Sequence, residues 1–279
     1  MILMDGKALR DKILSEIKEK IAKENIKASL AIILVGENEA SKIYIKNKVK
    51  ACNEVGIVPK TFFLPENTEE KEVCKLIKQL NEDKEITGII LQSPVPNHIN
   101  FDNCSSLIEQ FKDVDGFTMS NTYNLYLNKQ ALMPCTVRAV IKILDEYNIK
   151  LEGANVVIIG RGNIIGKPLS LALLNRNATV TIAHSKTKNL KEITKNADIL
   201  VSAVGKANLV TVDMIKENAV VIDVGISRVN GKVVGDVDFE NVATKCSHIT
   251  PVPGGVGPMT VAMIMNNVLK AKEMSDNNG

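Results

Sequence analysis

The chain has 279 residues and a formal net charge of +3 from 35 basic and 32 acidic side chains, a balance that excludes a strongly basic nucleic-acid-binding surface. Its five cysteines are scattered without a C-x-x-C pair and only three histidines accompany them, so we expect reduced, cytoplasmic thiols, no disulfide framework and no metal site. We expect no membrane association, because the N-terminal segment lacks the apolar core of a signal peptide and no apolar stretch reaches membrane-spanning length.

The first half of the chain alternates helical and strand patterns. Apolar side chains recur at helical spacing over residues 7–24, and Gly56 is a suitable C-terminal cap for a second helix. We expect helices over residues 7–24, 39–55 and 68–80, and strands over residues 29–36, 58–64 and 87–92. This alternation predicts an N-terminal α/β domain, followed by a bridging helix over residues 137–147.

The helix predicted over residues 39–55 carries three polar side chains that could act together. Ser41, Tyr44 and Lys48 stand at positions i, i+3 and i+7, which place them on one face. A tyrosine hydroxyl beside a partly desolvated lysine can form an acid/base pair. The alternative is a solvated basic helix on which Tyr44 packs against the core, and the segment alone leaves both interpretations open.

A glycine-rich turn begins the second half. The β-branched run Asn155 to Ile159 leads into Gly160-Arg161-Gly162-Asn163-Ile164-Ile165-Gly166 and then a helical pattern, and another strand follows over residues 178–185. This βαβ unit predicts a nucleotide pyrophosphate site at a helix N-terminus. The Gly-x-Gly-x-x-x-Gly spacing is one residue longer than the usual dinucleotide fingerprint, so a simple tight connection is the alternative.

The residues around this turn favour NADP over NAD. A ribose hydroxyl would need an acidic partner near the end of the second strand, but no acid occurs between Glu152 and Glu192. The chain offers Ser185 and Lys186 there, and Arg161 adds a guanidinium that can pair with phosphate. The alternative for Ser185 and Lys186 is an ordinary polar loop.

Further buried strands are predicted over residues 198–204 and 219–224, and residues 233–237 follow a short turn at Asn230-Gly231. A last short strand is predicted over residues 248–250, and a last helix begins at Met259. The fold class is therefore α/β, with a Rossmann-like, doubly wound parallel sheet as the second domain. We assign residues 1–139 to a substrate domain completed by the helix over 259–275, and residues 140–258 to a dinucleotide domain. We expect the last helix to return to the first domain and a cleft to lie between the two.

Several segments in a fixed order carry a resemblance to a known family. They are Tyr44-Ile45-Lys46-Asn47-Lys48, Gly88 to Pro94, Asp113-Val114-Asp115-Gly116-Phe117, Pro134-Cys135-Thr136, the glycine turn, Val221 to Ile226, Val233 to Val237 and Ile249 to Val261. Short-chain dehydrogenases also use a Tyr-x-x-x-Lys step, but their nucleotide strand precedes it, which is the opposite order. The chain closely resembles the bifunctional methylenetetrahydrofolate dehydrogenase/methenyltetrahydrofolate cyclohydrolase family over essentially its whole length.

The resemblance implies NADP-dependent oxidation of methylenetetrahydrofolate to the methenyl form and hydrolysis to formyltetrahydrofolate, in a cytoplasmic homodimer that serves one-carbon metabolism and purine biosynthesis. It implies that Lys48 is essential for hydrolysis, supported by Gln92 and Tyr44. The implied substrate-binding residues are Ser41, Tyr44, Gln92, Asp115, Pro253, Gly254, Gly255, Val256, Gly257 and Pro258. The implied cofactor-binding residues are Gly160, Arg161, Gly162, Ser185 and Ile226. Without the resemblance, Asp115 reads as a turn acid before Gly116.

The chain departs from the usual family pattern at Ser93, Thr118, Met119, Tyr123, Asn124, Val137 and Gly162. These departures bear on the balance of the two activities. Two other functions therefore stay open: a dehydrogenase with weak cyclohydrolase activity, and a non-catalytic NADP-binding sensor.

Overall fold

The computed structural model describes residues 1–276, which form two compact units. Unit 1 contains Met1–Arg10 and Thr136–Thr260, and unit 2 contains Asp11–Cys135 together with the chain from Val261 onward. The sequence predicts that the first ten residues belong to the substrate domain, which corresponds to unit 2. They belong to unit 1 because β1 (Ile2–Leu3) pairs in parallel with β11 (His248–Ile249).

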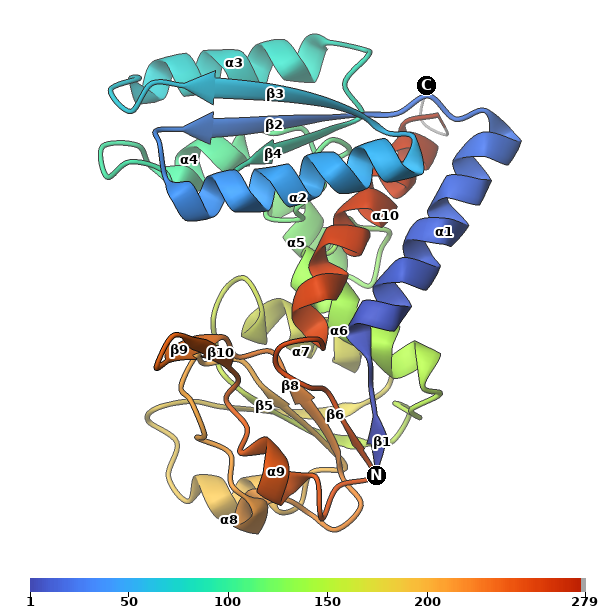
Figure 1. Cartoon of the computed structure of the whole chain (residues 1–279), viewed down its shortest axis with the longest axis vertical. Coiled ribbons are helices and arrows are strands. Elements are labelled where there is room, and N and C mark those ends of the chain that lie inside the picture. The colour runs from blue at the N-terminus through green and yellow to red at the C-terminus, as the bar shows by residue number, and fades with distance from the viewer. Residues whose placement is uncertain (277–279) are drawn as a thin grey trace. The chain divides into compact units, whose positions relative to one another are not determined.

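Unit 2 is built on a three-stranded parallel sheet in the order β3-β2-β4 (Figure 1). Its strands are β2 (Ser29–Val35), β3 (Val58–Leu64) and β4 (Gly88–Leu91). Every residue of β2 and β4 is buried, as expected for apolar strands covered on both faces. The helices α3 (Glu70–Glu82) and α4 (Phe101–Ser106) share one hydrophobic cluster with the sheet, and Figure 1 shows α2 (Glu39–Val55) on the side opposite α3.

The helix α2 has the bounds that the sequence predicts. Asn38 caps its N-terminus by accepting a hydrogen bond from the Ser41 N–H, and Gly56 ends it in the left-handed conformation with φ of 90°. Unit 2 also contains α5 (Met119–Tyr126), and α6 (Cys135–Glu146) begins at the end of unit 2 and lies in unit 1 from Thr136 onward. Thr118, one of the departures from the family pattern, is the N-cap of α5.

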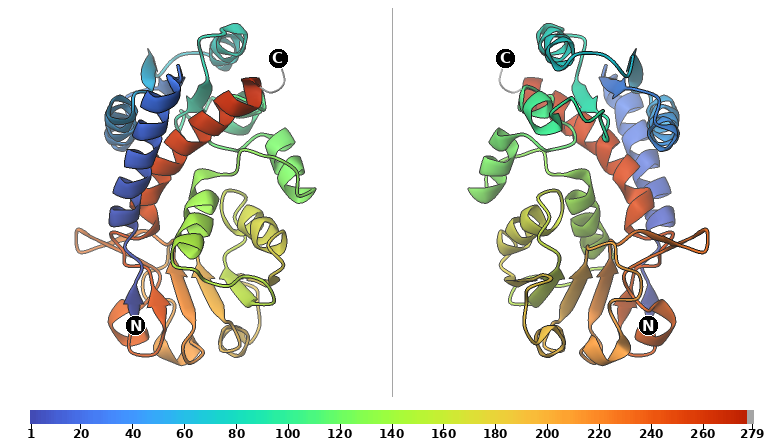
Figure 2. Two further views of the ribbon diagram at one scale, coloured as in Figure 1. Left: turned by 90° about the vertical axis from the view of Figure 1, so that its right-hand side faces the viewer. Right: turned by 90° about the vertical axis from the view of Figure 1, so that its left-hand side faces the viewer.

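The last helix, α10 (Val256–Asp276), packs within unit 2 from Val261 onward. Both views in Figure 2 show it beside α1 (Gly6–Glu24), and an ion pair between Lys20 and Glu273 joins the two helices. The Asn267 side chain is fully buried and donates from Nδ2 to the carbonyls of Val114 and Met133, each at 2.9 Å. The predicted return of this helix to the first domain is therefore confirmed.

Unit 1 is built on a six-stranded, fully parallel sheet in the order β1-β11-β8-β7-β5-β6. Its remaining elements are β5 (Asn155–Ile159), α7 (Gly166–Leu174), β6 (Thr179–Ala183), α8 (Leu190–Thr194), β7 (Ile199–Ser202), η1 (Val212–Met214), β8 (Val220–Asp223), the hairpin of β9 (Ser227–Val229) and β10 (Lys232–Val234), and α9 (Phe239–Val242).

The strand order reverses at β5, which lies between β6 and β7. The chain moves outward from β5 to β6 and then back past β5 to β7, so right-handed crossovers place α7 and α8 on opposite faces of the sheet. Open parallel sheets bind ligands at the carboxyl ends of the strands beside such a reversal. The fold class predicted from the sequence is confirmed. No helix within residues 1–276 is long and apolar enough to cross a membrane.

Candidate active site

A buried lysine–amide pair lies in unit 2. Lys48 on α2 donates from Nζ to Oε1 of Gln92, directly after β4, over 3.0 Å. Gln92 in turn donates from Nε2 to the Ser93 carbonyl at 2.7 Å, which fixes the orientation of its amide. The two residues are only 8% and 9% exposed. A lysine ammonium that is held in place and shielded from water is suited to proton transfer at a defined position.

Asp115 lies close enough to Lys48 for their charges to interact. Burial raises the pKa of the Asp115 carboxyl, and the Lys48 ammonium works against that increase. The Cys135 thiol is 3.9 Å from Oδ1 of Asp115 and also donates to the Val114 carbonyl at 3.4 Å. Unit 2 thus gathers Lys48, Gln92 and Asp115, which stand far apart in the sequence.

A second carboxylate, which the sequence analysis did not single out, shapes the loop that carries Asp115. Asp113 is 2% exposed and accepts backbone hydrogen bonds from Gly116, Phe117 and Thr118 at 2.8–3.1 Å. It also accepts from Nδ2 of Asn121, whose Oδ1 accepts from the Leu132 N–H. Asp113 is therefore the anchor of the loop. An Asp two residues before an Asp-Gly turn was the available signal.

The other two residues predicted on α2, Ser41 and Tyr44, differ in their exposure to solvent. Ser41 is 1% exposed, and its hydroxyl is 3.5 Å from the Ser93 carbonyl oxygen. Tyr44 is 56% exposed, and within residues 1–276 its hydroxyl forms no hydrogen bond. The alternative in which Tyr44 packs against the core is therefore wrong. Its role beside Lys48 stays a prediction.

In unit 1 the glycine turn joins β5 to α7 with little free space at two of its three glycines. A Cβ on Gly160, whose φ is 127°, would lie 2.6 Å from the Ala203 carbonyl oxygen, and one on Gly166 would lie 2.2 Å from the Gly160 carbonyl oxygen. A Cβ on Gly162 would meet no atom within 4 Å. Gly160 and Gly166 thus close the turn, while Gly162 leaves an open backbone that a phosphate can approach.

The predicted phosphate-binding side chains lie beyond two paired strand ends. Ile159 of β5 is in register with Ala183 of β6, and the Gly160 N–H donates to the Ala183 carbonyl at 2.8 Å. Arg161 and Ser185 each follow this pair by two residues, and both are exposed. Within residues 1–276 no carboxylate pairs with Arg161, which leaves its guanidinium available to an anion.

The glycine-rich segment before α10 forms part of a small pocket in unit 1. The pocket has a volume of about 110 Å³ and is lined by Val224 to Ile226 and Pro251 to Pro258, among others. Ile226 is 58% exposed. Gly6 packs against this segment, since a Cβ there would overlap the Gly255 carbonyl, and the Lys7 N–H donates to the Gly254 carbonyl.

Two buried aspartates, which sequence reasoning missed as a pair, hold the loops around Ile226. Asp223 accepts from the N–H groups of Gly225, Asp236 and Val237 at 2.9–3.0 Å. Asp236 accepts from the Ser202 hydroxyl and from the N–H groups of Val204 and Lys206 at 2.7–2.9 Å. Burial raises the pKa of Asp223, and the charge on Asp236 adds to the increase. These bonds fix the backbone at the carboxyl ends of β7 and β8.

Comparisons with known proteins agree over the whole chain. The family model for the tetrahydrofolate dehydrogenase/cyclohydrolase catalytic domain matches residues 4–115, and the model for the NAD(P)-binding domain of that family matches residues 134–276. The bifunctional protein FolD of Sulfurihydrogenibium sp. (strain YO3AOP1) is 53% identical over 276 residues, which are 97% of each chain.

Solved structures agree with the sequence matches. The bifunctional enzyme FolD of Campylobacter jejuni, a methylenetetrahydrofolate dehydrogenase/cyclohydrolase, superposes with a TM-score of 0.96 at 48% identity and 99% coverage of both chains. The methylenetetrahydrofolate dehydrogenase-cyclohydrolase of Trypanosoma brucei, solved with NADP and an inhibitor, gives a TM-score of 0.92 at 34% identity, covering 99% of this chain and 98% of that one. The chain therefore belongs to the tetrahydrofolate dehydrogenase/cyclohydrolase family.

Proposed function

We propose that the chain oxidises methylenetetrahydrofolate to methenyltetrahydrofolate with NADP and hydrolyses the product to formyltetrahydrofolate. The observation that carries the second activity is the buried hydrogen bond from Lys48 to Gln92. Family membership supports the first activity together with the second.

Hydrolysis of the methenyl bridge requires proton transfer. A water molecule loses a proton as it attacks the bridge carbon, and a ring nitrogen gains one as the bridge opens. Lys48 is the residue that we assign to this transfer, because its amine is held by Gln92 and largely shielded from solvent. Hydride transfer needs no such group, so the two activities make different demands on Lys48.

Asp115 is the residue that we assign to the pterin. An ionised carboxylate can accept two parallel N–H bonds from an aminopyrimidine edge. The nearby Lys48 ammonium favours the ionised form of Asp115 against the effect of burial. Lys48 would thus support substrate binding as well as proton transfer, and removal of its charge should raise the folate requirement slightly.

The residues of unit 1 fit a dinucleotide phosphate. The open backbone at Gly162 provides the close approach that a pyrophosphate needs, and Arg161 and Ser185 provide a guanidinium and a hydroxyl for a ribose phosphate. NADP bound by these residues would supply the nicotinamide ring that takes up the hydride. The ordered loops around Asp223 and Asp236 would support Ile226 beside the cofactor.

We also propose a cytoplasmic homodimer that supplies formyltetrahydrofolate for purine biosynthesis. The family resemblance of the sequence supports this proposal. Sedimentation equilibrium of the full chain would test the oligomeric state, and a monomer at micromolar concentration would contradict it.

A coupled assay tests the proposed activities. Methylenetetrahydrofolate and NADP are supplied, and the absorbances of NADPH and of the methenyl compound are followed together. NADPH formation without lasting methenyl accumulation supports both activities. Methenyl accumulation supports a dehydrogenase with weak hydrolysis, and the absence of NADPH formation despite NADP binding supports a sensor.

A further inference from the structure

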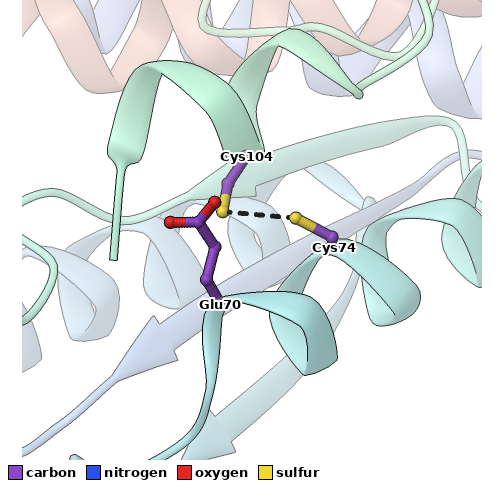
Figure 3. A group of neighbouring side chains, drawn as sticks. All are labelled: Glu70, Cys74 and Cys104. Atoms are coloured by element: carbon purple, nitrogen blue, oxygen red, sulfur yellow. Dashed lines mark hydrogen bonds between the residues drawn. The ribbon is translucent and has the colours of Figure 1, made fainter. Parts of the chain in front are cut away.

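Three side chains that can ligate a metal meet between α3 and α4 of unit 2. Glu70 and Cys74 stand four residues apart on α3, and Cys104 comes from α4. Figure 3 shows the three side chains converging from the two helices. One ligand atom of each lies within 4.8 Å of the others. The scattered cysteines, without a C-x-x-C pair and with only three histidines in the chain, predict no metal site, whereas the fold brings Cys74 and Cys104 together.

The distance between the two sulfurs is close to the one expected when both bind the same metal ion. Sγ of Cys74 and Sγ of Cys104 are 3.6 Å apart. A tetrahedral Zn²⁺ with Zn–S bonds of about 2.3 Å holds two sulfur ligands about 3.8 Å apart. A disulfide would require the sulfurs to approach to about 2.05 Å. A cation could therefore bind between the thiols with very little movement of α3 and α4.

The Glu70 carboxylate is already oriented by other groups. Its Oε2 accepts from the Asn100 N–H at 2.7 Å, and its Oε1 accepts from Nδ2 of Asn103 at 2.6 Å. Each oxygen keeps a further lone pair. Hydrogen bonds of this kind fix the ligating carboxylates of metal sites. Within residues 1–276 no lysine or arginine forms an ion pair with Glu70, so its negative charge lacks a cationic partner.

Two of the three residues are partly exposed, so a cation can reach them from solvent. Glu70 and Cys74 are half-buried, while Cys104 is fully buried and belongs to the hydrophobic cluster beneath the helices. Glu70 and Cys74 thus leave the site partly accessible to solvent, and Cys104 closes it on the side of the hydrophobic cluster. Thiolate ligands select soft cations such as Zn²⁺ over Mg²⁺ or Ca²⁺.

We propose that Glu70, Cys74 and Cys104 form a binding site for a thiophilic divalent cation, Zn²⁺, with water as the fourth ligand. Binding transfers one proton from each thiol to solvent, since a coordinating thiol is deprotonated. The bound cation joins α3 to α4, the helix that precedes the loop of Asp113 and Asp115. The site is independent of the proposed enzymatic function.

The test uses the full chain, reduced and freed of metal by a chelator. Co²⁺ is titrated first, because thiolate ligands give it a charge-transfer absorption, and Zn²⁺ is then measured in competition with a chromophoric chelator. We expect one cation per chain and a rise in melting temperature when Zn²⁺ is added. Cys74→Ala and Cys104→Ala should each reduce the charge-transfer band by about half or more, because each removes one of the two thiolate ligands. Glu70→Gln should weaken Zn²⁺ binding about tenfold or more, and Asn103→Ala about tenfold.

Matched controls separate the site from general metal binding. Glu72→Gln on the same helix and Cys246→Ser in unit 1 should keep the affinity of the parent. Circular dichroism without metal establishes that each variant folds, and if Cys104→Ala does not fold, the half-buried Cys74 and Glu70 variants decide. An unchanged band in Cys74→Ala overturns the proposal. So does a reduced chain that binds no cation, or a Cys74–Cys104 disulfide in place of a cation site.

Discussion

Lys48 and Gln92 are joined by a 3.0 Å hydrogen bond between the second helix of unit 2 and the end of β4. The bond joins residues 44 positions apart in the sequence, and it places the amine of Lys48 against the amide oxygen of Gln92 where both residues are largely shielded from solvent. Because the Gln92 amide is itself held by the Ser93 carbonyl, the lysine amine has one preferred position. Proton transfer benefits from such a fixed position.

We expect Lys48→Met to separate the two activities. Methionine has a similar length and no charge, so the helix should be preserved while the proton-handling group is lost. Hydrolysis should fall by ~10²–10⁴. Measurable dehydrogenase activity should remain, and methenyltetrahydrofolate should accumulate. Lys46→Met, at an exposed position on the same helix, is the control. Hydrolysis at the parent rate in Lys48→Met would show that another group handles the proton.

The role of Gln92 can be tested by a double-mutant cycle. Gln92→Leu removes the acceptor but leaves the lysine, so it should reduce hydrolysis less than Lys48→Met does. The double variant should be no worse than Lys48→Met alone, because residues in one network are not additive. The measurement is the methenyl hydrolysis rate of all four proteins. Losses that simply multiply would mean that Gln92 acts independently of Lys48.

Cofactor selectivity tests the assignment of Arg161 and Ser185. Arg161→Ala combined with Ser185→Ala should weaken NADP binding more than NAD binding, because both residues are assigned to a phosphate that only NADP carries. Each lost charge-assisted hydrogen bond should cost about 1.5–3 kcal/mol, and less where water takes its place. Binding of both cofactors is measured by fluorescence titration. Equal weakening of the two would remove the assignment.

The glycine turn offers a contrast between packing and ligand access. Gly166→Ala places a Cβ 2.2 Å from a backbone oxygen and should destabilise the fold by about 1–3 kcal/mol. Gly162→Ser enters open space and should stabilise the fold by about 0.4–1 kcal/mol by restricting the unfolded chain. NADP binding should be retained in Gly162→Ser, because the open space at this position can hold a small side chain beside a phosphate and the serine hydroxyl can donate to that phosphate. Urea denaturation and cofactor titration provide both measurements, and a destabilised Gly162→Ser would contradict the open-space interpretation.

The elements that the sequence predicts correctly are those whose patterns lie within a short stretch of chain. The helix α2 combines helical periodicity with a glycine cap, and β5 is a continuous apolar run before a glycine turn, so both were placed correctly. The strand β1 has only two residues and no pattern of its own. It forms because β11 offers it a partner from the other end of the chain.

The site was predictable only in part, because much of it depends on contacts between distant residues. The family resemblance pointed to Lys48, Gln92 and Asp115, and their roles stay predictions. The anchoring role of Asp113 depends on hydrogen bonds to the following loop and to Asn121, which a sequence alone does not reveal. The Cys74 and Cys104 thiols meet for the same reason, through the packing of α3 on α4.

The pH dependence of stability tests the environment of Asp115. Burial raises its pKa in the folded state above the ordinary value of 3.8. Between the ordinary and the raised pKa, the folded chain holds more protons than the unfolded chain, so this group lowers the free energy of unfolding as pH rises through that window. The loss of folding stability caused by ionised Asp115 is complete above the raised pKa and absent below the ordinary pKa.

Asp115→Asn removes the ionisation and should remove this cost. The variant should be more stable than the parent at neutral pH, and its advantage should shrink as pH falls toward 3.8 and below. It should also bind folate more weakly in both reactions, because an amide donor replaces a carboxylate acceptor facing the N–H groups of the pterin. Urea denaturation of both proteins across pH gives the stability difference, and the folate dependence of both rates gives the binding effect. A stability difference that does not change with pH would show that the ionised Asp115 carboxylate does not destabilise the folded chain. An unchanged folate affinity would show that Asp115 does not bind folate and is only a turn residue.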